Sequence, residues 1–198
     1  MKKKLHPIML AGTGSDVGKS VIAAALCRIF KQDGYQPAPF KAQNMALNSY
    51  ATPEGLEIGR AQAVQAEAAG VPCHTDMNPL LLKPSSDHTS QVVLNGRPIG
   101  NRNAFEYFRK EGREELRQEV NAAFDRLAAR YNPIVMEGAG SISEINLRDT
   151  DLVNMPMACY ADADVILVAD IDRGGVFASV YGSVMLQTTE DKKRIKGI

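Results

Sequence analysis

The sequence predicts an α/β fold with three layers around a mostly parallel sheet, and three observations support this prediction. Short apolar runs alternate with segments of helical periodicity, as in chains that form parallel sheets. Two of these runs, residues 133–136 and residues 164–169 after the initial Asp164, are continuously apolar, which is typical of strands covered on both faces. A glycine-rich segment separates the first apolar run from the first helical segment. The 198 residues suffice for one large or two small domains.

The first strand and the first helix are expected on either side of that glycine-rich segment. Residues 7–11 are apolar and end in glycines, which is typical of a buried strand. From Gly18 the apolar spacing becomes that of a helix, and Gly34 suits the end of this helix. Five residues share one helical face: Ile22, Ala25, Leu26, Ile29 and Phe30.

The next elements are shorter. Residues 38–41 are interpreted as the end of a second strand, although the prolines there are unfavourable in a strand interior. Residues 57–69 are rich in Ala, Gln and Glu and stop before Gly70, so a helix is expected. Residues 80–82 and 91–94 are expected to form short strands.

A long helix is expected after Asn103. This residue, with Glu106 three positions later, resembles an N-terminal cap. Gly112 is expected to kink the helix, and the charged run 109–119 is expected to be its solvated face. The apolar stripe of the helix consists of Phe105, Phe108, Leu116, Val120, Phe124, Leu127 and Tyr131.

The last third of the chain is expected to add two strands and a helix. The apolar runs 133–136 and 164–169 are the strands, and a helix is expected over residues 176–186, after two glycines. Residues 192–198 resemble the lead into another strand. This pattern suggests a fragment of a longer protein.

Composition narrows the classes of function. Apolar residues make up 44% and charged residues 23% of the chain, the mix of an ordinary globular protein. The net charge is zero, which argues against nucleic acid or an anionic membrane as the main partner. No apolar run is long enough for a transmembrane helix, and the N-terminus does not resemble a signal peptide. Cys27, Cys73 and Cys159 lie far apart, so we expect reduced thiols in a cytoplasmic protein.

The glycine-rich segment has the context of a phosphate-binding loop, because a strand is expected before it and a helix after it. Its backbone N–H groups and the helix N-terminus would bind an anion. Lys19 would reach the outer phosphates and Ser20 would bind Mg²⁺. Thr13 stands where the strict motif has its first glycine, so the loop is a variant with one extra residue. The expected ATP-binding residues are Gly12, Thr13, Gly14, Ser15, Asp16, Val17, Gly18, Lys19 and Ser20.

Two further charged residues follow expected strands. Glu137 begins an E-G-A-G-S turn, and a carboxylate beside a phosphate loop suits Mg²⁺. The alternative is an ordinary glycine-rich turn. Lys41 ends the second strand, where it would stabilise phosphoryl charge, although a solvent-exposed lysine is the common case.

Polar residues beyond the same strand ends are candidates for substrate binding. Gln43, Asn44 and Asn48 would hydrogen-bond a polar substrate. Arg173 would bind a carboxylate, but an internal ion pair with a neighbouring aspartate is an equal alternative. The histidines have no metal-binding spacing, and no cysteine lies in a nucleophile elbow, so glutamine hydrolysis is not expected of this chain.

Five segments in this order closely resemble the cobyric acid synthase family: residues 12–20, 40–45, 57–62, 137–141 and 170–177. The chain is more distantly similar to dethiobiotin synthetase, which shares the variant loop, the strand-ending lysine and the E-G-A-G turn. The resemblance covers nearly all 198 residues and implies a P-loop NTPase fold like that of dethiobiotin synthetase. Residues 1–198 would then be the ATP-binding amidoligase domain, without its last strands and without a C-terminal glutaminase domain.

The resemblance also implies an activity, with ATP and Mg²⁺ as cofactors. In this family ATP phosphorylates the peripheral carboxylates b, d, e and g of adenosylcobyrinic a,c-diamide, and ammonia from glutamine then displaces phosphate. Lys19 and Ser20 take the phosphate-loop roles, Lys41 matches the lysine that lies near the phosphoryl acceptor in dethiobiotin synthetase, and Glu137 matches the metal carboxylate of the E-G-A-G turn. The resemblance thus implies Lys19, Lys41 and Glu137 as catalytic residues and Ser20 and Glu137 as metal ligands. Glu57 is nominated as a further metal carboxylate. The partners are the corrinoid substrate and the glutaminase domain, and a homodimer stays open.

Two other functions share these motifs. A regulatory ATPase of the partitioning kind has the same fold, but it carries a second lysine early in the loop, where this chain has Thr13 and Gly14. Cobyrinic acid a,c-diamide synthase and dethiobiotin synthetase itself are also alternatives. Residues 44–45 and 172–175 argue against both of these synthetases.

Overall fold

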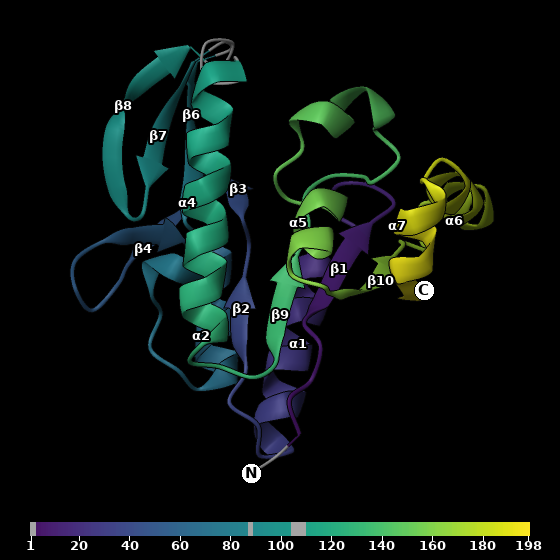
Figure 1. Cartoon of the computed structure of the whole chain (residues 1–198), viewed down its shortest axis with the longest axis horizontal. Coiled ribbons are helices and arrows are strands. Elements are labelled where there is room, and N and C mark those ends of the chain that lie inside the picture. The colour runs from purple at the N-terminus through teal and green to yellow at the C-terminus, as the bar shows by residue number, and fades with distance from the viewer. Residues whose placement is uncertain (1–2, 87–88, 104–109) are drawn as a thin grey trace.

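A parallel five-stranded sheet forms the centre of the computed structural model, which describes residues 3–86, 89–103 and 110–198. The strand order is β11-β10-β1-β9-β2, and every neighbouring pair is parallel. The strands are β1 (Ile8–Gly12), β2 (Ala38–Phe40), β9 (Ile134–Glu137), β10 (Asp164–Val168) and β11 (Ile195–Gly197). All their carboxyl ends therefore lie at one edge of the sheet (Figure 1).

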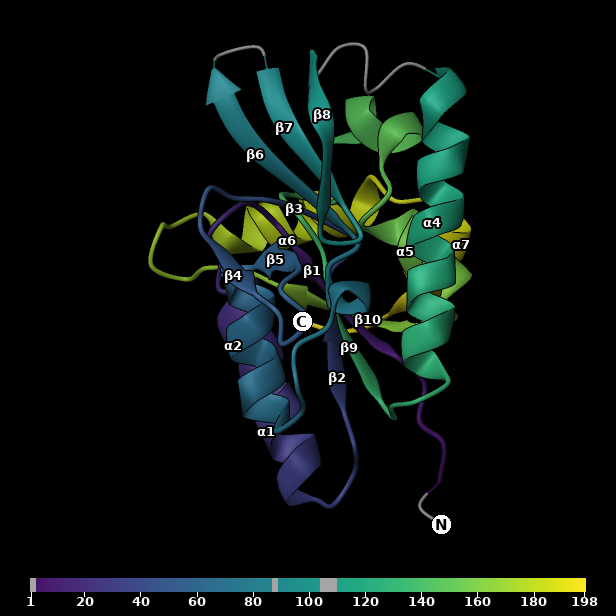
Figure 2. The same ribbon diagram turned by 90° about the vertical axis from the view of Figure 1, so that its left-hand side faces the viewer.

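Helices cover both faces of this sheet, as Figure 2 shows. One face packs on α1 (Lys19–Gln32) and α2 (Arg60–Ala69), and the other on α4 (Lys110–Ala128) and α5 (Met155–Tyr160). The strand residues alternate between two clusters: Leu10 and Val135 belong to the first, and Met9 and Met136 to the second. The predicted three-layer α/β fold with a mostly parallel sheet is confirmed.

A second sheet extends beyond the carboxyl edge of the first (Figures 1 and 2). Its order is β3-β6-β7-β8, with β3 parallel to β6 and the other pairs antiparallel. Only parts of β6 and β7 are expected from the sequence. The strands are β3 (Gln43–Met45), β6 (Leu80–Ser86), β7 (Thr89–Leu94) and β8 (Arg97–Asn103), and β4 (Ser49–Ala51) pairs separately with β5 (Glu57–Gly59).

The remaining short elements flank these sheets. Two 3-10 helices, η1 (Thr75–Met77) and η2 (Ile145–Thr150), and the helix α7 (Thr189–Arg194) are not expected from the sequence. The helix α6 (Val176–Met185) lies where residues 176–186 predict it. The strand expected near residues 192–198 is β11. Within the described residues, no helix combines the length and the apolar character that a membrane span needs.

The first helix has the predicted period but buries a different face. Its buried residues are Lys19, Ala23 and Cys27, whereas Ile22 and Ile29 are 38% and 48% exposed. The phase is set at the start of the helix, where Lys19 is directed into the glycine-rich loop. The small side chains of Ala23 and Cys27 then allow close packing on the sheet.

Two other helices begin or extend differently from the predictions. The helix expected from residue 57 begins at Arg60, because residues 57–59 form β5 and the N–H of Gly59 donates to Asn78 Oδ1 at 3.0 Å. The expected kink at Gly112 is not observed as a break, since α4 continues through it as one helix. Leu116, Val120, Phe124 and Leu127 are buried as predicted, and Tyr131 packs against them. Asn103 lies at the end of β8, while Phe105, Glu106 and Phe108 lie outside the described residues.

The three cysteines are free and differ in burial, so they should react differently. Burial raises the pKa of the Cys27 thiol to about 12, and burial also raises the pKa of Cys73. At pH 8 only about one Cys27 in ten thousand would be a thiolate. We expect Ellman's reagent to titrate the exposed Cys159 rapidly in native protein, and Cys27 and Cys73 only after unfolding. Three fast equivalents would contradict this assignment, and raising the pH toward 12 should accelerate Cys27.

Candidate active site

The phosphate loop lies between β1 and α1. Gly18 precedes α1 with a left-handed φ of 97°, which glycine adopts without strain. A Cβ on Gly12 would lie 2.5 Å from Lys19 Nζ and 2.8 Å from the carbonyl oxygen of Gly14, so only glycine fits there. The N–H of Thr13 donates to the carbonyl oxygen of Val168 at 3.0 Å, which ties the loop to β10.

Lys19 connects this loop to the glycine turn after β9. Its Nζ donates to the carbonyl oxygens of Gly14 at 2.7 Å and Gly140 at 2.9 Å. Burial lowers the pKa of Lys19, and the nearby ammonium of Lys41 lowers it further. An anion bound between the loop and the turn would offset both effects, because its negative charge would stabilise the ammonium form of Lys19. The attraction between the two charges would in turn favour phosphate binding at this position.

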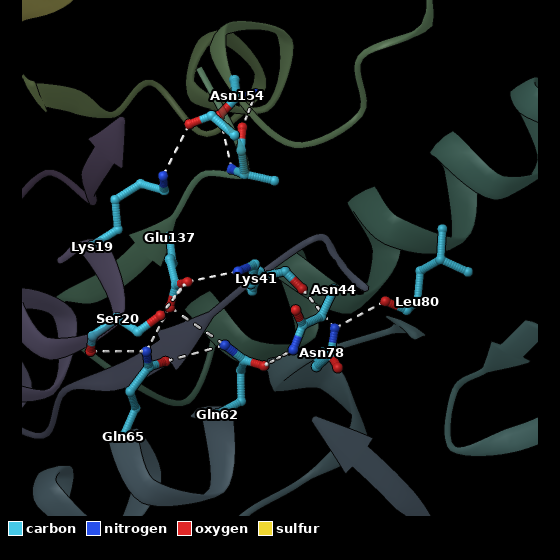
Figure 3. A network of polar contacts seen from close by, with 12 residues as sticks. Lys19, Ser20, Lys41, Asn44, Gln62, Gln65, Asn78, Leu80, Glu137 and Asn154 are labelled. Atoms are coloured by element: carbon cyan, nitrogen blue, oxygen red, sulfur yellow. Dashed lines mark hydrogen bonds and ion pairs between the residues drawn. The ribbon is translucent and has the colours of Figure 1, made fainter. Parts of the chain in front are cut away.

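Glu137 is the centre of a buried polar cluster at the end of β9 (Figure 3). Its side chain is 2% exposed. Oε1 accepts hydrogen bonds from Ser20 Oγ at 2.7 Å and from Lys41 Nζ at 2.6 Å. Oε2 accepts one from Gln65 Nε2 at 2.6 Å. The carboxylate therefore joins α1, β2, β9 and α2 at one point.

Two glutamines of α2 complete this cluster. Gln62 and Gln65 are 0% and 1% exposed, and Gln65 also donates to the carbonyl oxygen of Ser20 at 3.3 Å. Neither glutamine belongs to a local motif that would predict a role for it. The missed signal is their spacing, because they share the buried helical face with Ala66 and Ala69 at i, i+3, i+4 and i+7. Polar residues at buried helix positions indicate a polar partner in the core.

Two asparagines fix the segments that carry the charged groups. Asn78 Nδ2 donates to the carbonyl oxygens of Lys41 at 3.1 Å and Leu80 at 3.0 Å, so it holds the end of β2. Asn154 binds both backbone groups of Ala139, accepting from its N–H at 3.0 Å and donating to its carbonyl oxygen at 2.9 Å. No local sequence pattern predicts these two roles, since Asn78 holds Lys41 and Asn154 holds Ala139 across 37 and 15 positions.

The candidate substrate residues are not gathered in one place. Gln43 is half-buried at the start of β3, next to the cluster. Asn44 is 8% exposed and its amide donates inward to Gln62 Oε1 at 3.0 Å. Asn48 is exposed, and Arg173 pairs with Asp170 at 3.1 Å. The internal ion pair left open by the sequence is therefore the one that the structure contains.

Glu57 does not join the Ser20–Glu137 pair. Its carboxylate accepts from Lys83 Nζ at 2.5 Å, between β5 and β6. Among the described residues, neither Ser20 nor Glu137 forms a hydrogen bond with it. This geometry therefore does not support Glu57 as a metal ligand. In the structure its ion pair with Lys83 connects β5 to β6.

Comparison with known proteins identifies the family. Residues 8–198 match the family model described as the CobQ/CobB/MinD/ParA nucleotide binding domain. The chain belongs to this nucleotide-binding domain family. Residues 8–198 are therefore a nucleotide-binding domain of this family.

Several relatives of this nucleotide-binding domain are named cobyric acid synthase. One from Phocaeicola vulgatus is 98% identical over 198 residues, one from Bacteroides fragilis is 88% identical, and one from Syntrophobacter fumaroxidans is 61% identical over 194 residues. The matches cover 100%, 100% and 98% of this chain but only 40%, 40% and 37% of the relatives. A solved structure, the signal recognition particle receptor FtsY from Elizabethkingia anophelis with GDP, has a TM-score of 0.48 and 15% identity, covering 94% of this chain and 47% of that one.

The donor set of the nucleotide-binding domain fits a magnesium ion only together with a nucleotide. Among the described residues there is no group of three or more His, Cys, Asp or Glu side chains that would hold a metal. Ser20 Oγ and Glu137 Oε1 lie 2.7 Å apart and are hard oxygen donors. Mg²⁺ typically takes one or two carboxylates, waters and phosphate oxygens, so phosphates in the loop would complete this set.

Proposed function

We propose that this nucleotide-binding domain is the ATP-dependent synthetase part of a cobyric acid synthase. The reaction would convert the b, d, e and g carboxylates of adenosylcobyrinic a,c-diamide into amides. Ammonia would come from glutamine, hydrolysed in a glutaminase domain elsewhere in the full-length protein. The observation that carries the proposal is the convergence of Lys19, Ser20, Lys41 and Glu137 beside one phosphate loop.

The proposed reaction has two balanced steps. An oxygen of the substrate carboxylate attacks the γ-phosphorus of ATP, and ADP leaves. Ammonia then attacks the carbonyl carbon of the acyl phosphate, inorganic phosphate leaves, and the nitrogen loses a proton. Phosphorylation is needed because a carboxylate oxygen is otherwise a poor leaving group.

The chain's own residues would act chiefly by position and charge. Lys19, directed between the loop and the Gly140 turn, would hold the outer phosphates. Lys41 would approach the transferring phosphoryl group from the end of β2, and both ammonium groups would offset its developing charge. Ser20 and Glu137 would hold Mg²⁺, which supplies further charge neutralisation when bound. Gln65 and Asn78 keep Glu137 and Lys41 in place.

The proposal is tested with the full-length protein, by following ADP release with ammonium chloride and a corrinoid. We expect ADP release that requires adenosylcobyrinic a,c-diamide and Mg²⁺, and a hydroxamate when hydroxylamine replaces ammonia, since hydroxylamine intercepts acyl phosphates. No corrinoid-dependent ADP release would contradict the proposal. Turnover with cobyrinic acid or with a diaminononanoate substrate alone would point to the two other synthetases, and ATP-driven dimerisation without turnover to a partitioning-type ATPase.

A further inference from the structure

A pocket of about 690 Å³ opens beside the phosphate loop, at the carboxyl edge of the central sheet. One wall begins at Gly140 and continues through η2 to the start of α5, and the other is formed by β3. The volume lies within the range of roughly 300–1,000 Å³ that small-molecule sites occupy. The pocket shares Ala139, Gly140 and Ser141 with the turn after β9, and most of its other lining residues lie in the segment from η2 to the start of α5.

We propose that this pocket binds the corrin macrocycle and presents one peripheral carboxylate to the two lysines. The inference rests on the proposed function and assigns its substrate a place. One contact and one sequence neighbour on the pocket border support it. The carbonyl oxygen of Gly140 accepts from Lys19 Nζ at 2.9 Å, and Gln43 follows Lys41 by two residues. A molecule in the pocket would therefore lie next to both segments that position the ammonium groups.

The pocket wall has the chemistry of a site for a large, partly apolar ring. Met45, Ile145 and Leu147 line it and are 60%, 52% and 49% exposed. Single exposed apolar side chains are ordinary, but three that converge on one pocket indicate a binding surface. Burial of these side chains by an apolar ring face would be favourable. Arg148, also on the wall, is paired with Asp191, so it would bind a substrate carboxylate only by sharing or exchanging that partner.

Hydrogen bonds anchor the pocket wall that contains η2 near both of its ends, while apolar side chains of η2 between them are exposed. Asn154 fixes the backbone of Ala139, and Gln187 Nε2 donates to the carbonyl oxygen of Ile142 at 2.7 Å. Between these anchors, η2 carries Ile145 and Leu147 on exposed positions. The pocket is therefore largely preformed, which limits the entropy lost when a ligand binds.

The test compares two isoleucines of similar exposure in the full-length protein. Ile145→Glu puts a charge into the pocket wall, while Ile29→Glu puts one on α1, where Ile29 is 48% exposed and does not line the pocket. The readouts are the KM of the corrinoid, the KM of ATP, and corrinoid binding by equilibrium dialysis. For Ile145→Glu we expect the corrinoid KM and dissociation constant to rise about tenfold or more, because a charge is costly in an apolar contact. The ATP KM should stay within about twofold, as should all values for Ile29→Glu.

Each other outcome overturns the assignment. Unchanged corrinoid binding in Ile145→Glu, with an active wild type, refutes the pocket and leaves the proposed function intact. An increased KM for ATP alone would place the nucleotide base in the pocket. A wild type without corrinoid-dependent ADP release refutes both. If Ile145→Glu does not fold, Ile145→Thr removes apolar surface without adding charge, and an unchanged corrinoid dissociation constant for that variant also refutes the pocket.

Discussion

Replacing Glu137 by alanine should lower the free energy of unfolding by about 3–5 kcal/mol, because the substitution leaves a buried cation without its partner. Lys41 is 9% exposed and its Nζ lies 2.6 Å from Glu137 Oε1. The donors of Ser20 and Gln65 would lose their acceptor as well. For a chain of this length the melting temperature should fall by roughly 6–20 °C, measured by calorimetry or circular dichroism.

The matched control removes a Lys–Glu pair from the surface. Glu190 and Lys193 pair at 2.8 Å on α7, with side chains that are 79% and 66% exposed. Glu190→Ala should change the free energy of unfolding by no more than about 1 kcal/mol, since solvent screens the exposed pair. Equal losses in the two variants would show that burial of the Glu137 cluster contributes nothing specific to stability.

Replacing Lys41 by methionine should reduce the kcat of corrinoid-dependent ADP release by roughly 10²- to 10³-fold, the effect of losing one preorganised group that stabilises transition-state charge. Methionine keeps most of the length of the side chain and removes the ammonium. In the proposed reaction Lys41 contacts the transferring phosphoryl group, whereas Lys19 binds ATP before transfer. The KM of ATP should therefore change far less than kcat, measured below the melting temperature of the variant.

Lys83→Met is the control for this prediction. Lys83 also forms an ion pair with a glutamate, at 2.5 Å from Glu57, but the pair lies between β5 and β6. We expect a kcat within about twofold of the wild type for Lys83→Met. A kcat for Lys41→Met within about tenfold of the wild type would refute a catalytic role of Lys41, whose ion pair with Glu137 would then be structural only.

The sequence predicts two kinds of site residue: those in a contiguous motif and those next to the end of a strand. The phosphate loop is recognised because its glycines, Lys19 and Ser20 are contiguous and stand between a strand and a helix. Lys41 and Glu137 are recognised because each ends a strand, and parallel strands bring such ends to one edge. In the structure Ser20 and Lys41 both donate to the carboxylate of Glu137.

The residues that the sequence does not reveal act across long separations. Gln65 and Glu137 are 72 positions apart, and Asn78 reaches back 37 positions to the carbonyl oxygen of Lys41. No local pattern contains such partners, although the two glutamines on the buried face of α2 are a usable sign. The buried face of α1 was missed for a related reason. Its apolar residues follow the helical period, but Lys19 sets which positions face the sheet.

Most of the second sheet was missed because its strands have weak individual signals. β8 contains a proline, a glycine and two arginines, a composition that rarely indicates a strand. Its structure comes from pairing with β7, which in turn pairs with β6. Each strand of such a sheet depends on pairing with the adjacent strand, so the pattern of a single segment does not predict it.

Because Lys19 already donates hydrogen bonds to the protein backbone, an anion that binds at this loop competes with backbone carbonyl oxygens for its ammonium group. The ammonium has three N–H donors, and two of them are already taken by the carbonyl oxygens of Gly14 and Gly140. An arriving phosphate can take the third donor at once, but to bind a second one it must displace Gly14 or Gly140, and the free energy gained is then only the difference between the new and the old hydrogen bond. When the phosphate departs, the same oxygens take the cation back, and the loop keeps its shape. In the proposed reaction these internal acceptors would weaken phosphate binding and favour its release, which would suit the amidation of several carboxylates of one substrate in turn.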